Sequence, residues 1–176
     1  DSQFRSLLAT MREHQFTTVC TPFDEASVTR IEAHGIEVIK IASCAFTDWP
    51  LLERIARTSL PLIASTAAAK IEDIDAVVSF FAHRDKQLAL LHCVGEYPTA
   101  DEQLAIHQVE LLRARYPSTR IGFSSHENPN HTETIMLALA KGATILEKHV
   151  GLATERYALN AYSASPEQIV PWLAAG

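Results

Sequence analysis

The chain has 176 residues, of which 47% are hydrophobic and 20% charged, as is ordinary for one globular domain with a real hydrophobic core. Its formal net charge of -6 argues against a nucleic-acid-binding surface, and no apolar run is long enough for a membrane span. Cys20, Cys44 and Cys93 lie in or just after apolar runs without a CxxC pair, which predicts reduced thiols in a cytoplasmic protein. Asp1 is not a natural start, so we expect residues before it.

The sequence predicts that helices and strands alternate along the chain. Asp24 is expected to cap one helix and Gly35 to end it, whereas Pro171 is expected to disturb the last helix. In chain order the spacing of apolar residues predicts a helix at 4–14, a strand at 17–20, a helix at 24–34, a strand at 38–43, a helix from about 48, a strand at 62–66, a helix at 71–83, a strand at 88–93, a helix at 103–116, a strand near 121, a helix at 132–141, a strand at 145–150 and a helix at 166–172.

This alternation predicts right-handed βαβ units and a parallel sheet. Two architectures fit it: an open doubly wound sheet, or most of an eight-stranded barrel. The sequence lacks the GxGxxG turn of dinucleotide-binding sheets, and nearly every predicted strand ends in a polar group, as at a barrel mouth. We therefore expect an α/β fold of the (β/α)8 class (a TIM barrel), with about six of the eight βα units present in this chain.

Two histidines, His126 and His149, end consecutive predicted strands. Neighbouring parallel strands lie about 5 Å apart, so the two imidazoles could share one divalent ion. No third His or Cys joins them at the spacing of a structural zinc site. An open site completed by water and substrate oxygens fits better and suits Mn²⁺ or Mg²⁺. The alternative is that each imidazole forms a hydrogen bond with a loop.

Lys40 stands inside an apolar predicted strand, where an ammonium group is costly unless it is paired. Its partner is either a bound phosphate or carboxylate, or an internal carboxylate such as Glu147 or Asp24. Small hydroxyl groups at strand ends can hold phosphate together with helix N-termini, although singly each is more often a helix cap. With Lys40 they predict an anion pocket; these residues are Ser43, Ser65, Thr66 and Ser124.

Several other side chains are candidates for this edge of the sheet. His92 ends an apolar strand, as core histidines often do, and Cys93 has no base at a spacing that would activate a nucleophile. Tyr97 lies in a loop and could line a sugar pocket. Glu147 and Lys148 lie on opposite faces of their strand, so one is expected to point inward and the other toward the helices. The remaining histidines are expected at the surface: His14, His34, His83, His107 and His131.

The ordered set of motifs resembles a known family. The motifs are Thr21-Pro22-Phe23-Asp24, Lys40-Ile41-Ala42-Ser43, Ser65-Thr66, Leu91-His92-Cys93 with Tyr97-Pro98, Gly122-Phe123-Ser124-Ser125-His126 and Glu147-Lys148-His149. In this order and spacing they resemble the sialic acid synthase family of N-acetylneuraminate synthases, and most of all its branch labelled spore coat polysaccharide biosynthesis protein E. The resemblance runs from about Thr18 to the C-terminus.

The resemblance implies a barrel enzyme that condenses phosphoenolpyruvate with an amino-sugar aldehyde, giving a nonulosonic acid and phosphate. It implies that His126 and His149 bind the metal, Mn²⁺ or Mg²⁺, and act in catalysis with Glu147. It also implies a homodimer in the full-length protein, and it implies that the first two βα units and a C-terminal antifreeze-like domain lie outside residues 1–176. The residues that match family positions around phosphoenolpyruvate are Thr21, Lys40, Ser43, Ser65 and Ser124. Tyr97 matches a position near the sugar.

The chain also departs from the family pattern. Ala45 and Leu159 replace two acidic residues, Ala67 replaces a glycine, and Ser125 replaces an aspartate. These changes imply a different acceptor or reduced activity. Two alternatives therefore stay open beside the synthase: another metal-dependent aldolase on the same barrel, and a non-catalytic barrel that binds a sugar or a partner.

Overall fold

The structure, a computed structural model, describes residues 2–176 and divides into two compact units. The first unit comprises residues 2–64 and Ala69–Leu88, and the second comprises Ser65–Ala68 and Ala89–Gly176. None of the helices formed by residues 2–176 is both long and apolar enough to cross a bilayer.

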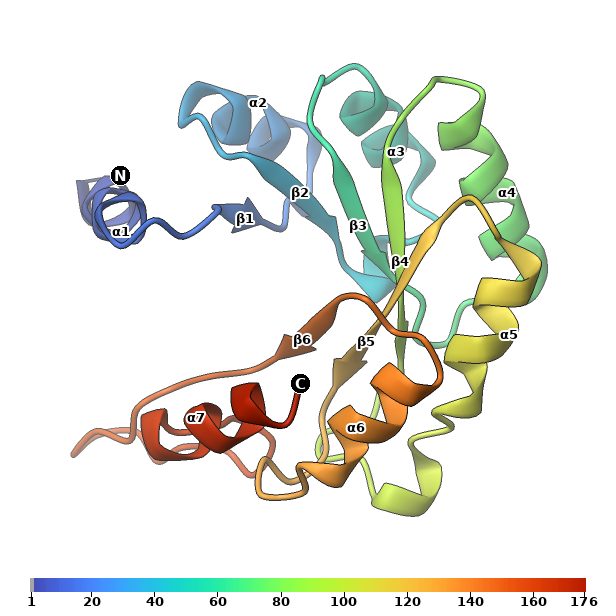
Figure 1. The fold of residues 1–176 in the computed structure, drawn as a ribbon. Helices are drawn as coiled ribbons and strands as arrows, with labels where there is room; N and C mark the ends of the chain where they lie inside the picture. The colour runs from blue at the N-terminus through green and yellow to red at the C-terminus, as the bar shows by residue number, and fades with distance from the viewer. Residues whose placement is uncertain (1) are drawn as a thin grey trace. The chain divides into compact units, whose positions relative to one another are not determined.

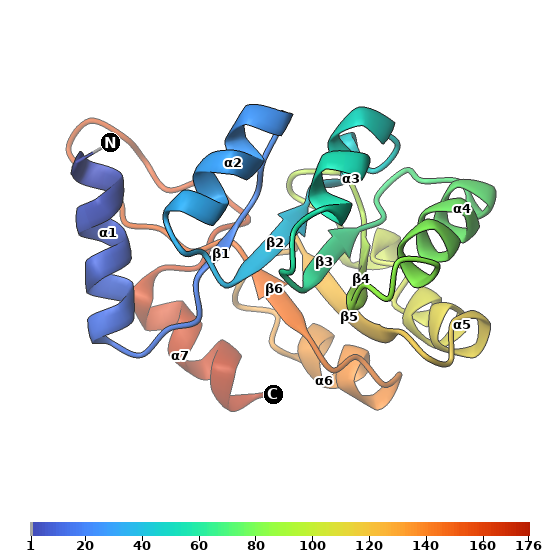
Figure 2. The ribbon, with the colours of Figure 1, turned by 90° about the horizontal axis from the view of Figure 1, so that it is seen from above.

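The first unit contains three parallel strands in sequence order. Strand β1 pairs with β2 through Val19↔Val38, and β2 pairs with β3 through Ile39↔Leu62. Helices α2 and α3 lie side by side against one face of these strands (Figures 1 and 2). The elements are α1 (Ser2–Glu13), β1 (Val19–Cys20), α2 (Glu25–Ala33), β2 (Val38–Ile41), a 3-10 turn η1 (Ser43–Ala45), α3 (Trp49–Ala56), β3 (Leu62–Ser65, its last residue in the second unit) and α4 (Ile71–Ala82).

The second unit also has three parallel strands in sequence order. Strand β4 pairs with β5 through Leu91↔Gly122, and β5 pairs with β6 through Phe123↔Leu146. Helix α5 packs against β5 (Figure 1). The elements are β4 (Leu88–Cys93, its first residue in the first unit), a 3-10 turn η2 (Asp101–Gln103), α5 (His107–Arg115), β5 (Arg120–Ser125), α6 (Glu133–Ala140), β6 (Leu146–Lys148) and α7 (Pro166–Ala174).

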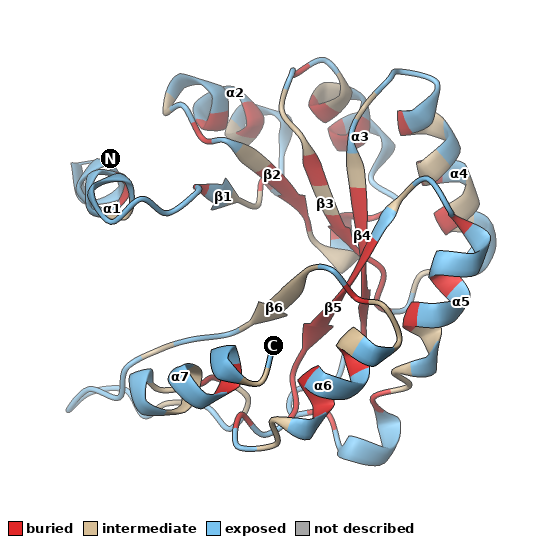
Figure 3. Cartoon of the chain, in the orientation of Figure 1, coloured by how far each residue is buried: buried red, intermediate tan, exposed pale blue. Residues whose placement is uncertain are grey.

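These pairings confirm the parallel α/β prediction. Within each unit the described strands follow the sequence order, without the reversal that marks the switch point of a doubly wound sheet. Buried residues concentrate on β2 and β3 in the first unit and on β4 and β5 in the second (Figure 3). Strands that are buried along most of their length need continuous apolar runs, and the runs Val38–Ile41 and Leu88–Cys93 supply them. The six described strands fit the expected six βα units.

The predicted helix caps form. The Asp24 carboxylate accepts the backbone N–H of Ser27 at 2.6 Å, which satisfies a donor in the first turn of α2. Gly35 follows α2 with φ +64°, a left-handed conformation that costs glycine little. At α3 the Asp48 carboxylate accepts the N–H of Leu51 at 3.2 Å.

Two predictions about helices are wrong. The helix expected to begin at residue 103 begins at His107, because the Leu104 carbonyl accepts a hydrogen bond from His92 Nε2 at 2.9 Å and Ala105 turns to φ +48°. Pro171 does not disturb α7, which continues to Ala174. Proline removes a single N–H near the end of this helix, and the Pro171 carbonyl still accepts from Ala175.

Gly122 permits the close approach of β5 and β6. A Cβ atom at this position would lie 2.3 Å from the carbonyl oxygen of Ile145 and 2.5 Å from a methyl carbon of Leu91. That carbonyl accepts the backbone N–H of Phe123 at 2.8 Å, so it cannot move away without breaking the ladder. A glycine is therefore needed here to seat β6 beside β5, and the histidines after both strands depend on that seating.

Candidate active site

The second unit brings His126 and His149 together. The last ladder pair of the two strands is Ser125↔Lys148, and each histidine is the next residue along. The two imidazole centroids lie 5.2 Å apart with the ring planes 47° to each other. His126 is 3% exposed, whereas His149 is exposed, so the pair reaches from the interior to solvent. The juxtaposition expected from the sequence is confirmed.

The environment of His126 favours a neutral imidazole with one nitrogen available. Its Nδ1 lies 3.0 Å from the Val94 carbonyl oxygen, which can only accept, so Nδ1 carries the proton and Nε2 keeps a lone pair. Burial lowers the pKa of His126, the bond to Val94 opposes this shift, and nearby His149 adds to it. A neutral ring whose other nitrogen is held by a carbonyl is the form that binds metal ions in proteins.

Glu147 is held beside this pair by Ser124. The two residues are opposite each other in the β5–β6 ladder, and the Ser124 hydroxyl donates to Glu147 Oε1 at 2.7 Å. Ser124 is 3% exposed and Glu147 is half-buried, so this contact is partly buried. Lys148 lies on the other face of β6 and pairs with Glu127, with Nζ 3.1 Å from Oε1. The expectation that Glu147 and Lys148 point to opposite sides is therefore confirmed.

Two tyrosines pack against the imidazoles. The Tyr97 ring lies 4.1 Å from that of His126 and 6.3 Å from that of His149. Tyr162, which the sequence analysis missed, lies 6.1 Å from His126 and 5.2 Å from His149 between ring centroids. No local sequence pattern predicts a role for Tyr162. Its position near the imidazoles follows from the pairing of Ala164, two residues later, with Val150 just beyond β6. Four rings from three chain segments thus form one cluster.

Ser65 presents an unusual polar atom at the end of β3. Its side chain is 3% exposed, and its Oγ has no hydrogen-bond partner among residues 2–176. An unpaired buried hydroxyl costs roughly 1–3 kcal/mol, and a ligand oxygen or a bound water molecule would remove that cost. The neighbouring Thr66 hydroxyl, by contrast, donates to the Leu91 carbonyl at 3.1 Å. Of these two predicted hydroxyl groups, that of Thr66 is used in a hydrogen bond within the fold.

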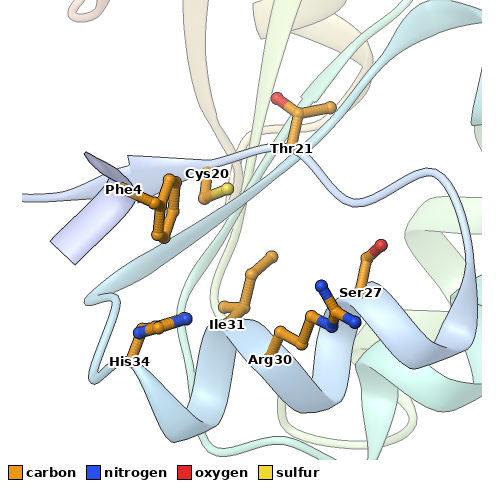
Figure 4. Close-up of a pocket in the computed structure, with 7 residues that line it drawn as sticks. All are labelled: Phe4, Cys20, Thr21, Ser27, Arg30, Ile31 and His34. Carbon is orange, nitrogen blue, oxygen red and sulfur yellow. The ribbon is translucent and has the colours of Figure 1, made fainter. Parts of the chain in front are cut away.

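Three predicted site residues belong to the first unit. Lys40 is 9% exposed on β2, and Ser43 is half-buried at the start of η1. Asp24, one possible partner proposed for Lys40, serves as the cap of α2. Thr21 borders a pocket of about 340 Å³ lined also by Cys20, Ile31 and Arg30 among others, and Figure 4 shows its hydroxyl directed away from Arg30. The pocket is lined by residues in or next to α1, β1 and α2, and it shares no residue with the ring cluster of the second unit.

His92 is a core histidine, as its position predicted. It is 7% exposed, its Nε2 donates to the Leu104 carbonyl, and burial lowers its pKa. The Cys93 sulfur lies 3.9 Å from His126 Nδ1, but that nitrogen already faces the Val94 carbonyl, so the geometry does not activate the thiol. None of the histidines expected at the surface is buried.

The donor set fits an open metal site. Within residues 2–176 no three His, Cys, Asp or Glu side chains converge so as to hold a metal ion by themselves. Two imidazoles 5.2 Å apart supply only part of a coordination sphere. The residues present therefore suit an ion whose remaining positions are filled by water and substrate oxygens, as Mn²⁺ and Mg²⁺ prefer.

Two curated proteins are similar to this chain in sequence. The chain is 37% identical to spore coat polysaccharide biosynthesis protein SpsE of Bacillus subtilis over 145 residues, which cover 81% of this chain and 38% of that protein. It is 31% identical to N-acetylneuraminate-9-phosphate synthase of Drosophila melanogaster over 151 residues, covering 85% of this chain and 40% of the synthase.

A crystal structure of a spore coat polysaccharide biosynthesis protein E from Chromobacterium violaceum superposes with a TM-score of 0.97 at 59% identity, covering 99% of this chain and 52% of that one. The chain thus spans about half or less of the length of these relatives. The family model of NeuB matches residues 1–170. By these matches and by the order of its motifs, the chain belongs to the NeuB family.

Proposed function

We propose that this chain forms part of a (β/α)8 synthase that condenses phosphoenolpyruvate with an amino-sugar aldehyde, giving a nonulosonic acid and phosphate for a surface polysaccharide. The observation that carries the proposal is the pairing of His126 and His149 beside Glu147, which Ser124 holds at 2.7 Å. A relative named as an N-acetylneuraminate-9-phosphate synthase, matched over 85% of this chain, supports the reaction class.

His126 and His149 are the residues that would hold a divalent metal ion. Such an ion, when bound, would polarise the aldehyde oxygen and orient a water molecule. The neutral state of His126, favoured by burial, suits this role, and the Val94 carbonyl fixes its ring. Tyr97 and Tyr162 would border the space in front of the imidazoles, where the sugar has to approach.

The anionic substrate would be held by the predicted hydroxyl and ammonium groups. Ser65 offers a buried donor with no protein partner among residues 2–176, so a phosphate or carboxylate oxygen would satisfy it. Lys40 supplies a positive charge in a nearly buried position. The other residues assigned to phosphoenolpyruvate are Thr21 and Ser43. Ser124, which the sequence also assigned to this substrate, already donates its hydroxyl proton to Glu147.

The reaction needs one new carbon–carbon bond and one water molecule. The π electrons of the phosphoenolpyruvate double bond form the new bond from its methylene carbon to the aldehyde carbon, and the aldehyde oxygen takes up a proton to become a hydroxyl. Water then adds to the carbon that bears the phosphate. The phosphate then leaves with the electrons of its carbon–oxygen bond. Glu147 is positioned by Ser124 to accept the proton that this water gives up.

Two departures from the family bear on the acceptor. Ala45 is 6% exposed and offers neither a proton nor a hydrogen bond, and Leu159 is half-buried against Gly151. A site that lacks a hydrogen-bonding group loses the discrimination which that group provides. We therefore propose an acceptor other than free N-acetylmannosamine. A non-catalytic barrel is the second candidate, favoured by the same two side chains. A cytoplasmic homodimer is part of the synthase proposal.

The test is phosphate release by the whole protein that contains this chain, with phosphoenolpyruvate, Mn²⁺ and a panel of amino-sugar aldehydes. We expect release with at least one aldehyde and little with N-acetylmannosamine. Lys40→Ala should weaken phosphoenolpyruvate binding in a calorimetric titration at least tenfold, because a charge-assisted contact is lost. Binding without release for any aldehyde would favour the non-catalytic barrel. Pyruvate chemistry without phosphate release would favour another aldolase.

A further inference from the structure

The residues next to the two histidines in the sequence form a buried ion pair. The side chains of Glu127 and Lys148 are 0% and 1% exposed, and Lys148 Nζ lies 3.1 Å from Glu127 Oε1. The same ammonium also donates to the backbone carbonyl oxygen of Glu127 at 2.7 Å. Glu127 follows His126 in the chain, and Lys148 precedes His149. The pair therefore connects the two backbone segments that carry the imidazoles.

Stability alone gives a poor account of this pair. Removing two charges from water costs several kcal/mol per ion, and a well-packed apolar pair of similar volume is often at least as stable. Glu127 Oε2 has no hydrogen-bond partner among residues 2–176, so even the carboxylate is incompletely satisfied. Compared with an apolar pair of similar volume, this ion pair is therefore not expected to add to the free energy of folding.

Its location shows what it can supply. The β5–β6 ladder ends at Ser125↔Lys148, one residue before each imidazole. Beyond that point the histidine backbones are held by loops on other sides: the His126 carbonyl accepts from Thr99, and the His149 carbonyl accepts from Ala164. The contacts of Lys148 with Glu127 connect the segment after β5 to the end of β6, at the point where the backbone pairing of the two strands stops. Contacts at this point join the two segments one residue away from each imidazole.

We propose that Glu127 and Lys148 are positioning residues that set the distance and angle between the imidazoles of His126 and His149. Neither residue touches the substrate in this role; both act through the backbone of the histidines. The proposal rests on the proposed function for the purpose of the spacing, but its geometric claim concerns these two residues alone.

The experiment compares three variants of the whole protein: Lys148→Met, the double variant Glu127→Met with Lys148→Met, and Lys141→Met. Lys141 forms an exposed ion pair with Glu110 at 2.9 Å and serves as the matched control. Mn²⁺ affinity is measured by calorimetry well below the melting temperature, alongside the melting temperature itself. Lys148→Met should lower both, because it leaves a buried carboxylate unpaired and removes the contact to the Glu127 backbone.

The double variant separates the two roles. Its melting temperature should recover toward the wild-type value, since no buried charge is left unpaired, while its Mn²⁺ affinity should stay about 10- to 100-fold below wild type. Lys141→Met should change neither quantity. A folded double variant with wild-type Mn²⁺ affinity would overturn the positioning role.

A crystal structure of the double variant gives a readout that needs no metal. If the wild-type protein binds no Mn²⁺, the metal part of the proposed function fails, and the imidazole geometry then decides the positioning role. We expect the 5.2 Å separation of the ring centroids to change or the His149 ring to become disordered. Unchanged, ordered imidazoles would overturn the inference.

Discussion

Replacing Ser65 by alanine should stabilise the ligand-free protein while weakening substrate binding. The Ser65 Oγ is buried without a partner among residues 2–176, and an unsatisfied hydroxyl of this kind costs roughly 1–3 kcal/mol. Alanine removes that cost and leaves a space of only one oxygen atom. We therefore expect the free energy of unfolding of the whole protein to rise by about 1 kcal/mol in the absence of ligand.

Thr66→Val provides a control of opposite sign at the next position. The Thr66 hydroxyl donates to the Leu91 carbonyl, which also accepts the Thr66 backbone N–H at 3.1 Å. Valine keeps the shape and loses one satisfied hydrogen bond, for a cost of about 0.5–1.5 kcal/mol. The two variants should therefore differ by about 2 kcal/mol, although both replace a buried hydroxyl group near the end of β3.

Urea unfolding followed by circular dichroism measures these differences as shifts of the midpoint at constant slope. Calorimetric titration with phosphoenolpyruvate supplies the other half of the test. If Ser65 donates to a phosphate or carboxylate oxygen, Ser65→Ala should weaken binding about tenfold or more, since a hydrogen bond to a charged group is worth about 1.5–3 kcal/mol. Destabilisation of Ser65→Ala as large as that of Thr66→Val would refute the reasoning, because the hydroxyl would then be paired in the ligand-free protein.

Three further predictions follow from the geometry of the second unit. Gly122→Ala should lower the free energy of unfolding by about 3 kcal/mol or more, because the new methyl group would lie 2.3 Å from the Ile145 carbonyl oxygen; a near-normal melting temperature would contradict this. Burial lowers the pKa of His92. Just below pH 6.5, the His92 imidazole is therefore protonated in the unfolded chain but still neutral in the folded chain. Stability should then fall by up to about 1.4 kcal/mol per pH unit as the pH drops from 6.5 toward the folded pKa, and urea unfolding of His92→Gln should show a shallower dependence. His126→Ala and His149→Ala should each abolish Mn²⁺ binding in calorimetry, and wild-type affinity in either variant would exclude a shared ion.

The sequence predicted the strands well where local chemistry decides the outcome. The run from Val38 to Ile41 is rich in β-branched residues and forms β2, and the Asp24 cap of α2 follows from a short-range hydrogen bond. The neighbouring positions of His126 and His149 could be expected because consecutive parallel strands end at the same edge of a sheet.

Tertiary contacts decided the features that the sequence analysis missed. The start of α5 is displaced because His92, on strand β4, donates to the Leu104 carbonyl. A helix that began at residue 103 would use this carbonyl for its own hydrogen bonds. The pairing of Glu127 with Lys148 joins residues that are 21 positions apart, and neither has a marked local pattern. Tyr162 enters the ring cluster only through the placement of its loop. Such contacts depend on distances between segments, which periodicity and motif spacing do not report.

The bridge between Val150 and Ala164 has a consequence for how this family can diversify. The Gly151 N–H donates to the Ala164 carbonyl, and the Ala164 N–H donates to that of His149, so both ends of the intervening loop are anchored beside the imidazoles. Residues 152–158 between these anchors are all exposed. Insertions and deletions there can accumulate without displacing Tyr162. Changes in residues 152–158 can thus alter the exposed surface of this loop while the cluster of two histidines and two tyrosines keeps its place.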